Sequence, residues 1–137
     1  MVQMAGLKPG QQVIDLGAGD GRLLKEAVRA CPGIHAIGIE LVPTIWLLGW
    51  IKLRLSKSGR TVAWKMQNVM HTDMSKADVV FLYVLPRMME RLEEKFNSEL
   101  RPGTVVISNT FTFPGKQAVE EQVIQGKTVR RYVWTGA

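Results

Sequence analysis

The segment 13–22, VIDLGAGDGR, constrains the fold more than any other part of the sequence. The apolar run over 12–16 predicts a buried strand, and glycines at 17, 19 and 21 follow it directly. Beyond them, Leu24, Ala27 and Val28 recur at helical spacing until Pro32-Gly33 ends the pattern. Glycines between a strand and a helix allow a tight turn and a close approach of a ligand to the backbone. The segment therefore predicts a strand–turn–helix unit of an α/β fold.

The rest of the chain alternates short apolar runs with helical patterns, which is typical of a parallel sheet. Further strands are expected over 35–40, 61–67, 77–84 and 103–109, and helices over about 43–56 and 86–100. Two alternating runs within 118–134 flank Gln125-Gly126-Lys127 and predict an antiparallel hairpin. The expected architecture is a Rossmann-like, three-layer α/β/α fold, with five parallel strands closed by an antiparallel C-terminal hairpin. A length of 137 residues fits a single domain, 1–137.

Composition narrows the setting in which such a domain works. Its 46% hydrophobic and 22% charged residues are ordinary for a globular protein. The N-terminus lacks a signal-peptide pattern, and the longest apolar run, 41–51, is too short to span a bilayer. The single cysteine, Cys31, predicts a reducing cytoplasm. His35 and His71 have no second ligand at a useful spacing, so no metal is expected.

The net charge of +6 is unevenly distributed. No acid lies between Glu40 and Asp73, whereas this stretch contains several cations: Lys52, Arg54, Lys57, Arg60 and Lys65. A solvated face explains such a pattern. The alternative is that this stretch contacts nucleic acid, an anionic membrane or an acidic partner.

The expected helix over 43–56 carries more apolar residues than one sheet-facing stripe needs, namely Trp46, Leu47, Trp50, Ile51 and Leu53. Packing on the sheet is expected to account for most of them. The alternative is contact with a membrane surface, which would make the protein peripheral to the membrane, or with an apolar protein substrate.

Three acids decide which ligand the glycine turn suits. Glu40 ends the second expected strand, 19 residues beyond Gly21, where a carboxylate can accept from both ribose hydroxyls. A dinucleotide fingerprint would have a third glycine at Arg22, and its pyrophosphate would lie near Asp15 and Asp20. S-adenosylmethionine has a ribose, an adenine and two cationic groups but no phosphate. The acidic turn therefore favours S-adenosylmethionine over NAD, the alternative being a turn that serves packing alone.

VIDLGAGDGR resembles the first motif of the class I S-adenosylmethionine-dependent methyltransferases, and GIE (38–40) resembles the acidic end of their second strand. The segments GIELVPTIWLLGWIKLRL, ADVVFLYVLPRMMERLEEKF and LRPGTVVISNTFTFP resemble a smaller group. This group includes mitochondrial lysine methyltransferases that act on the adenine nucleotide translocase and the ATP synthase c-subunit, and prokaryotic relatives. The resemblance covers nearly the whole chain. It implies a seven-stranded sheet, S-adenosylmethionine as the cofactor and a protein lysine as the methyl acceptor.

The resemblance also implies which residues hold the cofactor. Its methionine part is expected at the glycine turn, at Asp15, Gly17, Gly19, Asp20 and Gly21. Its ribose and adenine are expected at Glu40 and Leu41, with Asn68 and Val69 near the adenine amino group. Tyr83 to Pro86 end the central strand beside the reactive methyl.

Methyl transfer is an in-line displacement that needs alignment and exclusion of water, so no elaborate catalytic constellation is expected. A lysine amine must react in its neutral form. Tyr83 is the candidate to orient the amine, and Asp73 is the candidate to accept its proton. The alternatives are packing at the end of a strand for Tyr83 and capping of a turn for Asp73.

The chain departs from the class in two places. The segment before the first strand, which would help to cover the cofactor, is short, and no full helix fits between the fifth strand and the hairpin.

Other activities stay open at this point. A nucleic-acid amine methyltransferase would end the fourth strand in Asn/Asp-Pro-Pro-aromatic, where this chain has YVLP. A small-molecule methyltransferase would need more chain for a lid, and a module that binds the cofactor without catalysis would show no turnover. An oligomer is also open.

Overall fold

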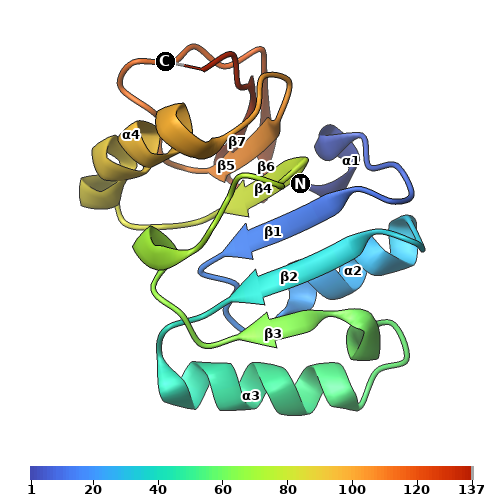
Figure 1. Ribbon diagram of the computed structural model, residues 1–137. Helices are drawn as coiled ribbons and strands as arrows, with labels where there is room; N and C mark the ends of the chain where they lie inside the picture. The colour runs from blue at the N-terminus through green and yellow to red at the C-terminus, as the bar shows by residue number, and fades with distance from the viewer. Residues whose placement is uncertain (137) are drawn as a thin grey trace.

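The computed structural model describes residues 1–136. Seven strands form one sheet in the order β3-β2-β1-β4-β5-β7-β6 (Figure 1). The strands are β1 (Gln12–Leu16), β2 (His35–Ile39), β3 (Ala63–Lys65), β4 (Val79–Leu82), β5 (Val105–Asn109), β6 (Glu120–Ile124) and β7 (Lys127–Val133). The first five run parallel, β7 lies antiparallel to β5, and β6 lies antiparallel to β7. This confirms the expected five parallel strands and antiparallel C-terminal hairpin.

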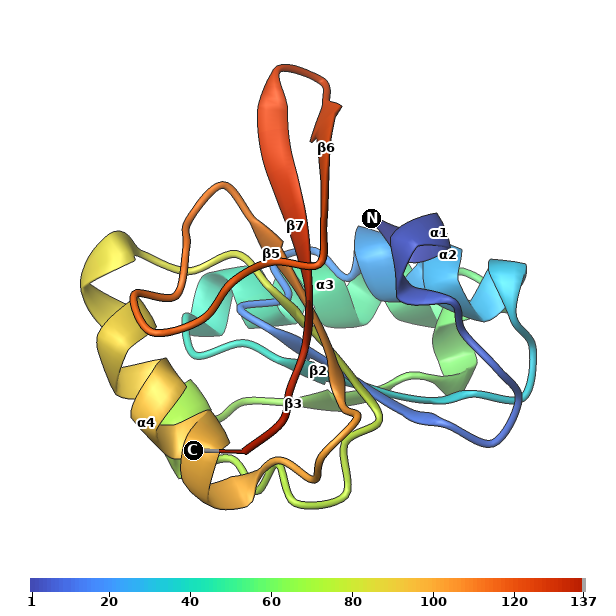
Figure 2. The same ribbon diagram turned by 90° about the horizontal axis from the view of Figure 1, so that it is seen from above.

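The helices are α1 (Val2–Ala5), α2 (Arg22–Ala30), α3 (Pro43–Arg54) and α4 (Met89–Glu99). Figure 2 shows α4 on one side of the strands and α1 and α2 on the other, which is the expected three-layer arrangement. Side chains alternate along the buried strands, so β1 sends Val13 toward the α1–α2 layer and Ile14 toward the α4 layer. Two apolar clusters result, and the one under α4 is closed by aromatic contacts among Phe96, Phe113 and Trp134.

Some boundaries differ from the sequence-based expectation. The third strand covers only 63–65 instead of 61–67, because Gly59–Thr61 (η1) forms a 3-10 turn before it. The helix after Pro86 opens with a 3-10 turn, Pro86–Met88 (η3), and the short helix α1 was not expected. No helix lies between β5 and β6, as expected from the length of that segment. Among residues 1–136, no helix is long and apolar enough to cross a membrane.

The packing of α3 contradicts the expectation that the sheet covers most of its apolar residues. Only Gly49 and Leu53 are buried, and Trp46 is half-buried. A Cβ on Gly49 would lie 2.4 Å from the Trp64 ring, so the helix approaches β3 through a residue without a side chain. The close approach buries a narrow stripe and leaves the opposite face of α3 exposed.

Candidate functional site

A cavity of about 560 Å³ opens beside the glycine turn that follows β1. The carboxyl ends of parallel strands are where open α/β sheets bind ligands, and Leu82 and Tyr83 at the end of β4 line the same cavity. The β6–β7 hairpin projects from the body of the molecule near the N-terminus (Figure 2). Ile124, Gln125 and Lys127 from this hairpin form the facing wall. The cavity therefore lies between the glycine turn and the C-terminal hairpin.

The glycine turn needs the backbone freedom of its glycines. Gly17, Gly19 and Gly21 have φ values of 71°, 59° and 80°, a region that side chains disfavour. The amides of Gly17 and Ala18 both donate to the Ile39 carbonyl at 3.0 and 2.9 Å, which fixes the turn to the end of β2. A Cβ on Gly19 would meet no atom within 4 Å. The turn is thus rigidly held and leaves open space at Gly19.

Glu40 joins the glycine turn to the start of α3. Its Oε1 accepts from the Gly19 amide at 3.0 Å, and its Oε2 accepts from the amides of Leu41 and Val42 at 2.9 and 3.1 Å. The side chain is buried, with 8% of the residue exposed. A carboxylate oxygen has two acceptor positions, so Oε1 retains one for a further donor. Glu40 therefore shapes the site as well as being a candidate ligand for a ribose.

Asp15 is the most perturbed acid in the site. It lies in β1, lines the cavity and is 5% exposed. Burial, and to a smaller extent the negative charge of Glu40, raises the pKa of Asp15 from 3.8 to about 8. The carboxyl is therefore protonated at neutral pH unless a cation binds beside it.

Asp20 has the opposite environment, although it lines the same cavity. Partial burial alone would raise its pKa, but hydrogen bonds from the Arg22 amide and the Lys52 ammonium, at 3.1 and 3.2 Å, outweigh burial and lower the pKa. Asp20 is therefore ionised and already paired with a cation of α3.

Tyr83 follows β4 and is half exposed at the cavity. Its ring stacks on Phe111, with the ring centroids 6.4 Å apart. The Lys127 ammonium donates to the Tyr83 hydroxyl at 3.2 Å and lies 4.7 Å from the centre of the ring. The geometry thus shows that one face of Tyr83 accommodates a lysine side chain. Sequence reasoning missed Phe111 and Lys127 because their proximity to Tyr83 depends on how the hairpin folds back.

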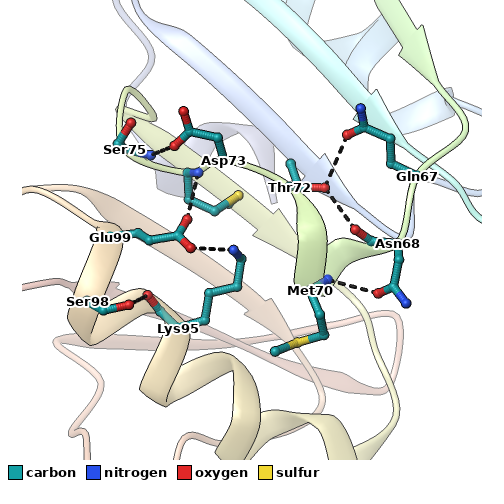
Figure 3. A network of polar contacts seen from close by, with 10 residues as sticks. Gln67, Asn68, Met70, Thr72, Asp73, Ser75, Lys95, Ser98 and Glu99 are labelled. Carbon is teal, nitrogen blue, oxygen red and sulfur yellow. Dashed lines mark hydrogen bonds and ion pairs between the residues drawn. The ribbon is translucent and has the colours of Figure 1, made fainter.

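Not every predicted cofactor residue lies in this cavity. Gly21 is outside it and is the N-cap of α2, where a Cβ would meet the Leu53 side chain at 3.0 Å. Leu41 is exposed beside the buried Glu40. Asn68 precedes the 3-10 turn η2 (Val69–His71), and its side-chain oxygen accepts from the Met70 amide at 2.9 Å (Figure 3). Val69, the next residue, is half-buried. Glu40, Leu41, Asn68 and Val69 follow the ends of β2 and β3 and do not line the cavity, which lies at the ends of β1 and β4.

The structure does not bring Asp73 to Tyr83. Its carboxylate accepts from the Ser75 amide at 2.9 Å, in a turn that Glu99 of α4 also contacts through the Met74 amide (Figure 3). Hydrogen bonds from Ser75 lower the pKa of this exposed carboxyl. Both observations favour the turn-capping alternative over proton acceptance. No group of three or more potential metal ligands occurs in residues 1–136.

The fold and the glycine-turn site are those of a class I methyltransferase domain. A family model described as the ANTKMT methyltransferase domain matches residues 15–120. The chain belongs to this family.

Among curated relatives, the Xenopus laevis lysine N-methyltransferase of the ATP synthase c-subunit is 32% identical over 74% of this chain and 44% of its own length. The Mus musculus adenine nucleotide translocase lysine N-methyltransferase is 32% identical over 82% of this chain and 48% of its own. The chain thus spans less than half the length of these two proteins. A protein-lysine N-methyltransferase of Saccharolobus islandicus is 31% identical over 84% of this chain and 71% of its own length.

Among solved structures, an RNA methyltransferase from Salinibacter ruber in complex with S-adenosyl-L-homocysteine matches with a TM-score of 0.89 and 28% identity. The match covers 96% of this chain and 86% of that one. A precorrin-6y C5,15-methyltransferase from Geobacter metallireducens matches with a TM-score of 0.77 at 18% identity, which supports the fold alone.

Proposed function

We propose that this chain transfers the methyl group of S-adenosylmethionine to the side-chain amine of a protein lysine. Family membership and three relatives named as lysine methyltransferases support the proposal. A cytoplasmic location is part of it, supported by the single, half-buried Cys31. The choice of a lysine as the methyl acceptor rests on the contact of the Lys127 ammonium with the hydroxyl and the ring of Tyr83.

The residues of the site fit S-adenosylmethionine. Gly19 leaves open space at a rigid turn, and Asp15 is a buried acid that a cationic ligand would ionise. Asp15, Gly17 and Gly19 would hold the amino-acid part, while Glu40 would accept from the ribose through the free position on Oε1. The adenine would lie toward the exposed Leu41 and the residues that follow β3, Asn68 and Val69. When bound, the cofactor supplies a methyl group already activated by a sulfonium.

Tyr83 would position the acceptor. Its hydroxyl and ring already contact one lysine ammonium, which shows that a flexible cationic chain can reach them. An incoming lysine that replaces Lys127 there would find an acceptor for its amine N–H and an aromatic wall formed with Phe111. Tyr83 would thereby orient the neutral amine and exclude water from one side, which is what an in-line displacement requires.

RNA methylation is the second candidate. The Salinibacter ruber protein, which matches nearly the full length of both chains, is named as an RNA methyltransferase. The basic stretch between Glu40 and Asp73 would suit a phosphate backbone. Against this candidate, β4 is followed by YVLP, which lacks the residues that grip a planar base amine.

The decisive experiment is methyl transfer from labelled S-adenosylmethionine to host extract divided into membrane protein, soluble protein and RNA. We expect label in protein, and mass spectrometry should place it on lysine. Label confined to RNA or to small metabolites would refute the lysine proposal, and cofactor binding without any labelling would identify a non-catalytic module.

A pair of variants controls this experiment. Gly19→Arg should abolish cofactor binding and labelling, because the side chain would enter the open space at the turn. Gly103→Arg is the matched control, since Gly103 also has a positive φ, 93°, and open space around its Cβ position but lies at the opposite end of the parallel strands. Equal loss in both variants would indicate unfolding instead of a blocked site.

A further inference from the structure

The outward face of α3 is apolar. An apolar row runs along successive turns through Leu47, Ile51 and Leu55, which are 50%, 43% and 80% exposed, and Leu48 beside them is 57% exposed. A helix that is apolar on all sides is normally buried. Here the inward stripe packs through Gly49 and Leu53, so the outward row has no partner within residues 1–136.

Cations flank this row on both sides. At about 100° per residue, Lys52 and Arg54 fall on opposite sides of Ile51. The Arg54 guanidinium lies 5.5 Å from the centre of the Trp50 ring, so its charge remains at the edge of the apolar row. Lys57 and Arg60 follow the helix in sequence and are exposed, and no acid occurs from residue 41 to residue 72. Asp20 pairs with Lys52 and is the one acid bonded to a side chain of the helix among the described residues.

The charges decide which occupant suits this face. A second copy docked through α3 would bring the two sets of Lys and Arg close together, and the stretch offers no acid to pair with them. A bilayer with anionic lipids satisfies both features, because acyl chains accept the leucines while headgroups pair with the cations. Trp50 at the side of the row matches the interfacial preference of tryptophan. We infer that α3 lies on the surface of an anionic membrane with its leucine row inserted between the headgroups.

This docking would also orient the site, a step that rests on the proposed function. Figure 1 shows α3 running along the β3 edge, beginning at the side where the carboxyl ends of the parallel strands lie. The two residues before α3, Leu41 and Val42, are tied to the glycine turn through Glu40, which accepts from their amides and from the Gly19 amide. A membrane bound along α3 would therefore lie beside the cofactor end of the sheet. The acceptor lysine would then belong to a protein in or on that membrane.

Vesicle flotation tests the inference. Vesicles of phosphatidylcholine alone and of phosphatidylcholine with about 30% phosphatidylglycerol would be compared at low and at physiological salt. We expect binding to the anionic vesicles at least tenfold stronger than to neutral ones. The double variant Leu48→Gln/Leu55→Gln should bind at least tenfold more weakly, while Val119→Gln/Val123→Gln, with similarly exposed apolar residues near the hairpin, should bind as wild type does. Arg54→Gln/Lys57→Gln should bind about 25-fold more weakly, about fivefold for each cation removed.

Three results would overturn the inference: no flotation with anionic vesicles, equal flotation of Leu48→Gln/Leu55→Gln and Val119→Gln/Val123→Gln, or a dimer in sedimentation that Leu48→Gln/Leu55→Gln disrupts. Calorimetry with S-adenosylhomocysteine separates this test from the proposed function. Lost flotation with intact cofactor binding would refute the membrane surface alone, and flotation without cofactor binding would refute the methyltransferase proposal alone.

Discussion

Asp15→Asn should stabilise the ligand-free protein, and the stabilisation should grow as the pH rises from 5 to 7. Burial, with a contribution from Glu40, raises the pKa of Asp15 from 3.8 to about 8. Between these two values the unfolded chain has lost a proton that the folded protein still binds, so stability falls as pH rises. Asparagine has no proton to lose, and the variant therefore escapes this decline.

The size of this stabilisation follows from the pH range between the pKa values of Asp15 in the unfolded and in the folded protein. Each pH unit between the two pKa values costs the wild type about 1.4 kcal/mol relative to a residue that does not titrate. The difference in free energy of unfolding between Asp15→Asn and wild type should thus increase by about 3 kcal/mol from pH 5 to pH 7. Other acids cancel from this difference because both proteins contain them.

Urea unfolding followed by tryptophan fluorescence at pH 5, 6 and 7 measures the difference. Asp20→Asn is the control, because the hydrogen bonds from Arg22 and Lys52 lower the pKa of Asp20. Asp20 is ionised in both states throughout this window, so its replacement should give an offset that does not change with pH. A constant offset for Asp15→Asn as well would refute the reasoning.

The same acid gives a second readout. A ligand ammonium beside Asp15 favours the ionised carboxyl, so binding of S-adenosylhomocysteine at pH 7 should release close to one proton. Calorimetry in buffers of different ionisation enthalpy counts that proton, and Asp15→Asn should release none.

Three further variants test other parts of the site. Glu40→Ala should weaken cofactor binding by about 1.5–3 kcal/mol in calorimetry. It should also lower the free energy of unfolding, because three backbone amides lose their acceptor. A loss of stability with unchanged affinity would show that Glu40 has a structural role only. Tyr83→Phe should lower kcat about 10- to 100-fold with cofactor affinity unchanged, as for one hydrogen bond to a charged or reacting group, and an undiminished rate would remove Tyr83 from the site. Gly49→Ala should cost about 1–3 kcal/mol in urea unfolding, since its Cβ would lie 2.4 Å from Trp64; wild-type stability would show that α3 is free to shift.

Local patterns were sufficient to predict the strand, glycine turn and helix around residues 12–30, because each needs only near neighbours in the chain. The same holds for the C-terminal hairpin, where Gly126 sits at the turn between two alternating runs. The glycine at 21 was correctly placed between strand and helix, but its packing against Leu53 depends on a helix more than 20 residues away in sequence. Periodicity shows that a helix has an apolar face without showing what covers it. For this reason the sequence did not show that most apolar residues of α3 are exposed.

Contacts between distant segments limited the prediction of the site. Lys127 reaches Tyr83 across 44 residues, through the pairing of β7 with β5 and of β5 with β4. A shift of one residue in either register would turn the side chain to the other face of the sheet. Likewise, the family resemblance implies that Asn68 lies near the adenine, but only the structure shows its oxygen accepting from the Met70 amide.

The three acids around the glycine turn explain why a loop typical of nucleotide binding can select against phosphate. Asp20 is paired with Lys52, and Glu40 is satisfied by three amides, so neither needs a further cation from the ligand. Asp15 has no such partner among residues 1–136, and its raised pKa shows that its surroundings already disfavour negative charge. A pyrophosphate would add to that cost, whereas an ammonium or sulfonium would offset it by ionising Asp15. The sign of the ligand's charge, more than the shape of the turn, therefore separates S-adenosylmethionine from NAD, and calorimetry should detect no NAD binding at concentrations that saturate S-adenosylhomocysteine.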